Sequence, residues 1–337
     1  MRNWLKILAV FLLYLLFLQT ESRALSPRET ILQLLKYYSP TGYYIVNQYE
    51  TAPEEVEFQK WKTKFKKSDF MNFVRGDSIE DLLRSINTVV HETAHSYILV
   101  KAYQLCKDRK GKSIPGYDAY YIGNETNITV KKTPIFNTTE IIGSIPESLR
   151  TFRFKTYISD ESDKNIGSKI NGVYGLLDEY HAYYHGNKAA FDLYPYYRDK
   201  MSESPEKWHN YFYGVNGSLA ASMEFEFYIL KYLQYAKANY PKIYRDILHN
   251  KDFCAAFLTI KKNHAQLAED YFKVKEELFE MLRQEGYTVS EDEQSYTIEK
   301  DHIRVRVTNN LESYFLLQRE LEKEEHLIIL KELENAL

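Results

Sequence analysis

The longest run of helical periodicity in this sequence begins after Asp77. Apolar residues recur there at spacings of three and four, which is the pattern of one buried helix face. We therefore predict a single helix from this point to about Cys106. Its apolar positions are Leu82, Leu83, Ile86, Val89, Val90, Ala94, Tyr97 and Ile98.

Two segments before this helix carry helix-start signals. Ser26, Pro27 and Glu29 have the spacing of a capping box, which predicts a helix to about Tyr38. The stretch TAPEEVEFQKWKTKF, which begins at Thr51, repeats the signal and predicts a second helix.

The pattern changes between Gly116 and Ile158. The stretches YDAYYIG, NITVKK and RFKTYI are rich in β-branched and aromatic residues and are separated by Asn, Gly and Pro. We predict a small antiparallel sheet or hairpins in this region rather than more helix.

Helical patterns return downstream, over residues 173–184 and 219–239 and in a further stretch that ends near Gly286. A hairpin is predicted in YTVSEDEQSYTIEKDHIRVRV, and a charged helix from Leu311 closes the chain. The charges of that last helix are typical of a solvated face. The fold class that follows is α+β and mainly helical.

Composition narrows the possible functions. The chain of 337 residues has a net charge of -3, so no basic surplus favours nucleic acid. Its 30 tyrosines favour an aromatic core, with a peptide- or glycan-binding surface as the alternative. Cys106 and Cys254 can form one disulfide or stay free, because two cysteines do not make a disulfide framework.

The first residues have the order of a secretory signal. Arg2 and Lys6 precede an uncharged apolar run from Ile7 to Leu18, and small residues at Ser22 and Ala24 follow. The run is short for a membrane span. We expect cleavage after Ala24 and a secreted or periplasmic mature protein without a stable membrane span.

The sequence HETAH at residues 91–95 raises the question of a metal. Two histidines four apart on a helix project from the same face, so His91 and His95 can reach one zinc ion. Glu92 lies one step round the helix, where it can face a water bound to that ion. Zinc lowers the pKa of such a water, and the carboxylate can take its proton as a general base during hydrolysis.

A zinc peptidase needs a third protein ligand. The metzincin extension would place a glycine and a histidine where this chain has Ile98 and Lys101, so the ligand must come from elsewhere. The stretch NGVYGLLDEYHAYYHG supplies Glu179, with Asp178 as the alternative ligand or as a second-shell partner of the histidines.

One face of that second helix consists of small residues. Glycine destabilises a helix interior by about 1 kcal/mol relative to alanine, so several on one face suggest that something packs very close there. We expect the HETAH helix and its metal to do so; the alternative is that the glycines end or kink the helix. The residues on this face are Gly172, Gly175, Ala182 and Gly186.

HExxH followed by a glutamate on a later helix, with β structure between them, resembles the gluzincin group of zinc metallopeptidases. The stretch LLDEYHAYYHG is similar to the ligand helices of some bacterial members, with His181 in place of their usual asparagine. The resemblance implies that His91, His95 and Glu179 bind zinc and that Glu92 is the general base. It covers about residues 78 to 186.

Further expectations accompany this resemblance. Tyr183 and His185 could donate hydrogen bonds to the oxyanion of the tetrahedral intermediate, although either could simply be packed. Asp178, His181 and His185 share an edge of their helix and could also hold a metal of their own. The region from Tyr117 to Ile158 could supply an edge strand that pairs with a peptide or protein substrate.

The resulting division of the chain has four parts: a signal peptide (1–24), an N-terminal helical segment (25–76), a zincin-like catalytic domain (77–285) and a C-terminal hairpin and charged helix (286–337). The predicted function is that of an exported zinc metallopeptidase. Two alternatives stay open: a non-catalytic extracellular peptide- or glycan-binding protein with a degenerate HExxH helix, and a metal-dependent hydrolase of non-peptide bonds.

Overall fold

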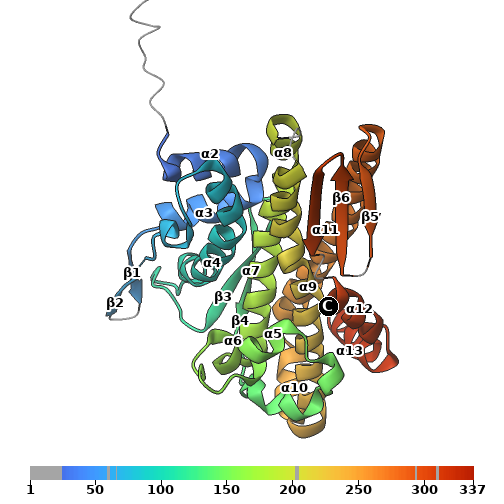
Figure 1. The fold of residues 1–337 in the computed structure, drawn as a ribbon. Helices are drawn as coiled ribbons and strands as arrows, with labels where there is room; N and C mark the ends of the chain where they lie inside the picture. Colours follow the sequence, from blue (N-terminus) through green and yellow to red (C-terminus); the bar gives the residue numbers. More distant parts are fainter. Residues whose placement is uncertain (1–24, 59–60, 66, 202–204, 293, 309–310) are drawn as a thin grey trace, which may run out of the picture.

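The computed structural model describes residues 25–337 except 59–60, 66, 202–204, 293 and 309–310, so the predicted signal segment lies outside the described residues. The fold is α+β and mainly helical, as the sequence predicted. Its centre consists of helices α4 (Ile79–Leu105), α7 (Gly172–Asp192), α9 (Pro205–Asn239) and α11 (Lys251–Gln284). Helix α7 packs against the other three (Figure 1).

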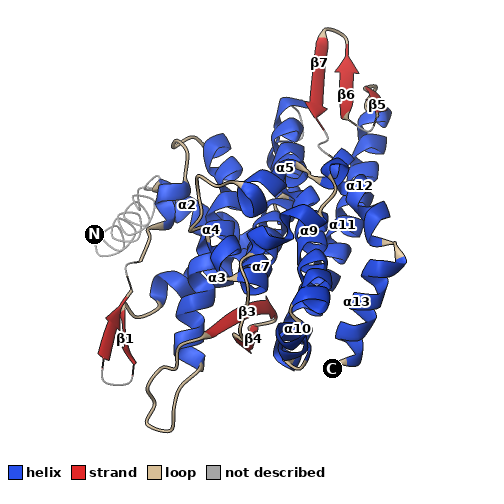
Figure 2. Ribbon diagram, turned by 90° about the horizontal axis from the view of Figure 1, so that it is seen from below, coloured by secondary structure: helices blue, strands red, loops and turns tan. Residues whose placement is uncertain are grey.

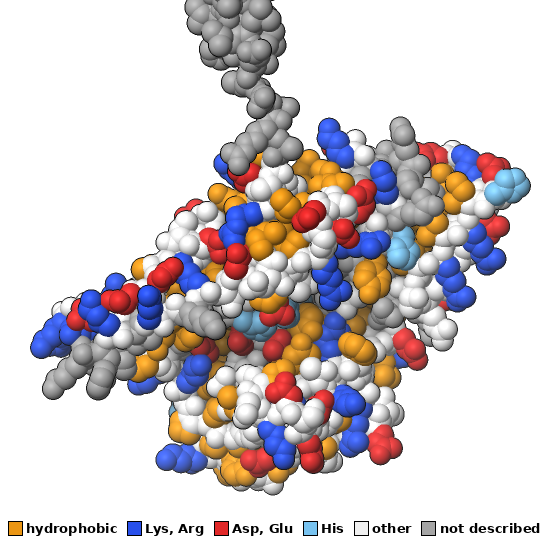
Figure 3. Space-filling view, turned by 60° about the vertical axis from the view of Figure 1, so that its left-hand side comes forward, with side chains coloured by type: hydrophobic (Ala, Val, Ile, Leu, Met, Phe, Trp, Pro, Cys, Tyr) orange, Lys and Arg blue, Asp and Glu red, His pale blue; other side chains and the backbone are white. Residues whose placement is uncertain are grey.

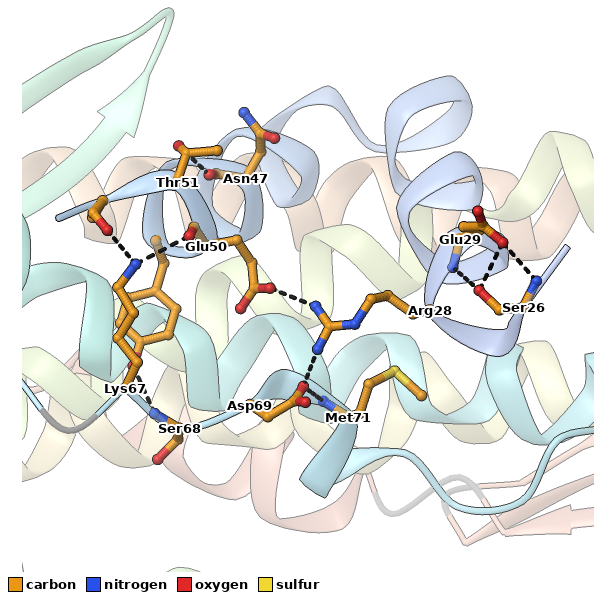
Figure 4. A network of polar contacts seen from close by, with 12 residues as sticks. Ser26, Arg28, Glu29, Asn47, Glu50, Thr51, Lys67, Ser68, Asp69 and Met71 are labelled. Carbon is orange, nitrogen blue, oxygen red and sulfur yellow. Dashed lines mark hydrogen bonds and ion pairs between the residues drawn. The ribbon is translucent and has the colours of Figure 1, made fainter. Parts of the chain in front are cut away.

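The N-terminal part packs on α4 through helices α2 (Pro27–Tyr38) and α3 (Pro40–Thr51). The capping box at the start of α2 is confirmed: the side chain of Ser26 accepts from the backbone of Glu29, whose carboxylate accepts from the backbone of Ser26. Arg28 then joins this helix to the next segments, because its guanidinium pairs with Glu50 at 2.5 Å and with Asp69 (Figure 4).

The helix predicted from Thr51 is wrong. Helix α3 ends at Thr51, and the following residues form a hairpin of β1 (Glu55–Phe58) and β2 (Trp61–Lys64). The segments EVEF and WKTK alternate with a period of two and contain β-prone residues. Their register also pairs opposite charges, Glu55 with Lys64 and Glu57 with Lys62, which favours the antiparallel arrangement over a helix.

The sheet predicted between Gly116 and Ile158 is confirmed for two of its three stretches. Strands β3 (Tyr117–Gly123) and β4 (Thr126–Lys131) form an antiparallel hairpin in which β3 packs on α4 (Figure 2). The stretch RFKTYI is helical instead, in α5 (Phe152–Phe154) and the π-helical turn η4 (Lys155–Ser159). Buried Arg153 explains the difference, because its guanidinium bonds to α9 rather than to a strand.

Shorter helices connect these elements, and α9 is followed directly by α10 (Pro241–Leu248), at the boundary that Pro241 predicts. The other short elements are η1 (Phe70–Phe73), η2 (Thr138–Ser144), η3 (Glu147–Leu149), α6 (Gly167–Ile170) and α8 (Tyr194–Met201).

The predicted C-terminal hairpin contains three strands in antiparallel order, β5 (Thr288–Glu291), β6 (Ser295–Lys300) and β7 (Ile303–Thr308). Two helices follow where one was predicted, α12 (Glu312–Leu321) and α13 (Glu324–Asn335).

This C-terminal segment shares its core with the central helices. Apolar residues of β6 and β7 belong to the same buried cluster as residues of α2, α4 and α9, and residues of α12 and α13 lie in a second cluster with α7 and α9. The predicted division at residue 286 therefore does not coincide with a break in the hydrophobic core.

Many of the tyrosines belong to this core, which supports the structural interpretation of the tyrosine content. Cys106 and Cys254 are both free. None of the described helices is long and apolar enough to cross a membrane. The fully buried tyrosines are Tyr97, Tyr120, Tyr174, Tyr180, Tyr211, Tyr228, Tyr232, Tyr271 and Tyr296.

Candidate metal centre

Helix α4 supplies the first two residues of the candidate metal centre. It begins at an N-cap, Ser78, and runs through the HETAH sequence without interruption, so His91 and His95 lie one turn apart on one face. His91 is buried and His95 is half-buried, and their Nε2 atoms lie 3.2 Å apart. Glu92 is half-buried beside them.

Helix α7 comes close enough to α4 to place its acidic residues at these histidines. At Gly186 an added Cβ would lie 2.7 Å from Asn87 Oδ1 and 3.0 Å from His91 Cβ, so only glycine fits there. Ala182 of α7 packs with Ala94 of α4 in one apolar cluster. The predicted close approach of the HETAH helix is thus confirmed at Gly186.

The other two glycines of that face have different neighbours. Gly175 lies against the backbone of Gly167 in α6, and Gly172 lies against the backbone of Phe136 and the hydroxyl of Tyr232. Gly172 also has a φ of 53° at the start of α7, a conformation that favours glycine. Close contact with α4 therefore explains only one of the three glycines.

Glu179 completes a triangle of possible ligand atoms. Its buried Oε2 lies 3.5 Å from His95 Nε2 and 3.8 Å from His91 Nε2, and the histidine nitrogens are 3.2 Å apart. Tetrahedral zinc with bonds of 2.0 to 2.1 Å separates its ligand atoms by about 3.3 to 3.4 Å. The three distances between these atoms are close to the edge lengths of such a tetrahedron, so the three side chains could occupy three of the four positions around a zinc ion.

Asp178 has the position of an orienting residue. Its Oδ1 lies 2.8 Å from His95 Nδ1, so the carboxylate can accept a hydrogen bond from the nitrogen that points away from Glu179. Metal-binding histidines commonly have such a carboxylate partner, which fixes the ring and leaves Nε2 to the metal. Glu179 is thus the carboxylate whose oxygen lies near both histidine Nε2 atoms, while Asp178 contacts the opposite nitrogen of His95.

Burial and neighbouring charges give the ionisable groups unusual pKa values. Burial lowers the pKa of His91 well below its usual range, and the charges of His95 and Arg153 lower it further. Burial also tends to lower the pKa of His95, but the carboxylates of Asp178 and Glu179 raise it well above the usual value. The pKa of Glu179 is raised, first by burial and then by Asp178 and Glu92. Perturbed values of this kind cluster at functional sites.

Tyr183 lies next to the cluster. Its ring contacts the His91 ring edge to face, with centroids 4.4 Å apart, and its hydroxyl is 2.9 Å from that of Tyr157. The guanidinium of Arg153 lies 4.7 Å from the centre of the same ring. Tyr183 is thus a hydroxyl-bearing side chain in contact with His91, and a hydroxyl in such a place can stabilise an oxyanion if it points to the reacting carbonyl.

His185 and His181 point to a different part of the structure. Their Nε2 atoms lie 2.9 and 3.0 Å from the backbone carbonyl of Tyr121 in β3, and both rings are buried. Burial lowers the pKa of His185 to about 3. These contacts fix α7 to the hairpin. They give no support to an oxyanion role for His185 or to a second metal held by Asp178, His181 and His185.

The same contacts bear on the predicted edge strand. Lys132 donates to the carbonyl of Gly116, so in the antiparallel alternation the backbone groups of Tyr121 point to the edge of β3 away from β4. The two histidines of α7 bond to the Tyr121 carbonyl on that edge. At this residue the edge is therefore already occupied, and strand addition to β3 stays a prediction for its other residues.

A cavity of about 600 Å³ lies near the cluster, but His91, Glu92, His95 and Glu179 are not among the residues that line it. Its walls come from α4, α9 and the segment before α4, and Tyr183 and Arg153 line it where it approaches His91. A space-filling view of this region shows a recess in which histidine and acidic side chains lie together, with basic side chains nearby (Figure 3).

Arg153 and Tyr157 are not among the site residues predicted from the sequence. Both lie in RFKTYI, which the sequence pattern predicts as a strand, whereas Arg153 is in α5 and Tyr157 is in η4. A positive charge within an apolar and aromatic stretch was the available signal, since buried arginine is found mostly where it has partners.

Comparison with known proteins identifies neither a family nor a function for this chain. No family model matches the chain, and no curated protein or solved structure matches it. The functional argument therefore rests on the geometry of this site.

Proposed function

We propose that the protein is an exported zinc-dependent metallopeptidase of gluzincin type, with His91, His95 and Glu179 as the zinc ligands. The observation that carries the proposal is the triangle of ligand atoms at 3.2, 3.5 and 3.8 Å, contributed by two helices that are far apart in sequence. The hydrogen bond that Asp178 can accept from His95 supports it independently, because such a carboxylate is the usual partner of a metal-binding histidine. Export rests on the sequence of residues 1–24 alone.

The chemistry assigned to each side chain follows from its place. Zinc on the three ligands would polarise the substrate carbonyl and acidify a water. Glu92, which adjoins His91 on α4, would take a proton from the attacking water and pass it to the leaving amine. Tyr183 would donate a hydrogen bond to the oxyanion that forms when the carbonyl is attacked.

The proposal is tested by replacing Glu92 with Gln. This variant should bind one zinc per chain like the wild type, because Glu92 is not a ligand, and should lose roughly 100- to 10,000-fold in kcat on a quenched fluorescent peptide library. Glu147→Gln is a matched control, since that glutamate is exposed (92% of its side-chain surface) on η3. Full activity in Glu92→Gln would refute the assigned mechanism.

The same experiment addresses the alternatives. A binding protein with a degenerate HExxH sequence would hold no zinc that depends on His91 or His95. A metal-dependent hydrolase of other bonds would bind zinc in the same way and leave every peptide of the library intact, in which case ester and amide substrates of other classes would be assayed next.

A further inference from the structure

The cavity beside the metal centre has an unusual charge for this protein. The chain as a whole carries a net charge of -3. The cavity, in contrast, is lined by three arginines, Arg75, Arg84 and Arg153, and by one acidic residue, Asp81. Its walls therefore have a surplus of positive charge next to the site where hydrolysis is proposed.

The three arginines differ in how far this charge is already compensated. Arg153 lies at the inner end, where its Nη1 is 2.7 Å from Glu224 Oε2 and its Nη2 donates to the carbonyl of Gly217. Its charge is thus balanced within the protein, and its side chain serves mainly to hold Tyr183 and α9 in place.

Arg84 has no such balance. Its Nε donates to the side-chain oxygen of Asn210 at 3.0 Å, which is a neutral acceptor. Within the described part of the chain no carboxylate forms an ion pair with Arg84 or with Arg75, and both residues are exposed. A ligand with a carboxylate could form charge-assisted hydrogen bonds with Arg84 without displacing an existing ion pair.

The position of Arg84 on α4 sets the distance between its positive charge and the substrate bond that would be cleaved. Arg84 precedes His91 by seven residues on α4, which is two helical turns on the same face and about 10 Å along the axis. An extended peptide advances about 3.3 to 3.6 Å per residue. An extended peptide bound at the metal centre would therefore reach Arg84 with a carboxylate about three residues from the cleaved bond. If the carboxylate is at the end of a long acidic side chain, that residue can be only about two residues from the cleaved bond.

We propose that this groove selects substrates that carry a carboxylate two or three residues from the scissile bond, bound mainly by Arg84 with Arg75 beside it. The inference rests on the proposed peptidase function and names the substrate class of that site. The carboxylate comes either from an aspartate or glutamate side chain or from a free C-terminus, since both present the same two oxygens.

The test is a set of peptides cleaved by the purified zinc-loaded protein. One series moves a single glutamate through the three positions on each side of the cleaved bond, against glutamine at the same position. A second series compares a free C-terminus with its amide at the same distances. We expect kcat/KM to be roughly tenfold higher for the glutamate or free-carboxylate peptide at one of these distances, and the advantage to shrink as salt is raised.

Arg84→Gln should reduce the ratio of kcat/KM between the acidic and the neutral peptide toward one. Arg304→Gln, in an exposed arginine of β7 outside the cavity, should leave that ratio at the wild-type value. Cleavage of acidic and neutral peptides at equal rates would overturn the charge selection and leave the peptidase proposal standing. Zinc-loaded protein that cleaves no peptide at all would overturn both.

Discussion

Among the residues that the structure describes, two groups of histidine and glutamate side chains have the composition of a metal site. One consists of His91, His95 and Glu179 and lies between α4 and α7. The other consists of Glu320, Glu325 and His326 and lies where α12 meets α13. In each group the possible ligand atoms lie within 4.8 Å of one another. The two groups differ in what surrounds them.

Each member of the C-terminal group already has a partner side chain outside the group. Lys323 pairs with Glu320 at 2.6 Å, Lys231 lies 3.5 Å from Glu325, and the amide of Gln234 is 3.1 Å from His326 Nδ1. A cation entering this group would have to replace ammonium groups already in place. At the α4–α7 centre no lysine or arginine of the described residues pairs with Glu179, and the charged partners of His95 are Asp178 and Glu179. We infer from this difference that a cation would compete with fewer existing ion pairs at the α4–α7 centre than at the C-terminal group.

The largest expected effect is on bound metal. His91→Ala should abolish zinc binding at micromolar concentrations, because only two of the three proposed ligands would remain. His326→Ala should leave one zinc per chain. Metal analysis of the purified proteins by mass spectrometry distinguishes these outcomes, and equal loss of zinc in both variants would contradict the comparison.

The second expected effect concerns the orienting carboxylate. Asp178→Ala should weaken zinc binding 10- to 100-fold, which is the usual cost of losing the partner of a metal-binding histidine. Glu320→Gln is the matched change in the other group and should not alter the affinity. Competition with a fluorescent zinc chelator measures the zinc affinity of both variants. An unchanged affinity in Asp178→Ala would mean that Asp178 does not orient a metal-binding histidine.

The third expected effect, smaller than the first two, is a loss of folding stability in acid that arises from the C-terminal group. Burial lowers the pKa of His326 despite the nearby carboxylates of Glu325 and Glu320. Below about pH 6.5 the unfolded chain therefore binds a proton that the folded chain does not, so stability present above that pH is lost as the pH falls. The loss for one such group is at most about 1.4 kcal/mol per pH unit.

Urea unfolding of zinc-free protein between pH 7.5 and 5 measures this slope. His326→Leu should show a flatter decline of the unfolding free energy with acid than the wild type does. The same slope in both proteins would mean that His326 does not titrate differently in the folded and unfolded states.

The smallest expected effect belongs to the lysine that faces this group. Lys231→Met keeps most of the side-chain stem and removes the contact with Glu325, which is half exposed. Such a pair contributes less than about 1 kcal/mol to the free energy of unfolding. A loss well above that value, measured by urea unfolding at neutral pH, would show that the ion-pair network stabilises the C-terminal helices more strongly than its exposure implies.

Local patterns predicted the central helices well. Residues 79–105 form one helix because their apolar stripe, N-cap and length all favour the same structure. The segments after Thr51 and around Arg153 were interpreted wrongly because their local signals conflict. Thr51 resembles a helix N-cap and ends a helix instead, and Phe154 and Ile158 are β-prone residues that lie buried in a helical turn. There, contacts with other parts of the chain outweighed propensity.

The sequence by itself determined which side chains could meet on one face of α4, because helical periodicity fixes the direction of His91, Glu92 and His95 relative to one another. It also narrowed the third ligand to two neighbouring carboxylates. Only the tertiary structure shows how these two differ in position: with α7 packed on α4 at Gly186, an oxygen of Glu179 lies near His95 Nε2 and an oxygen of Asp178 lies near His95 Nδ1. The uncompensated charge of Arg84 was likewise invisible in the sequence, because it depends on which carboxylates the fold brings within reach.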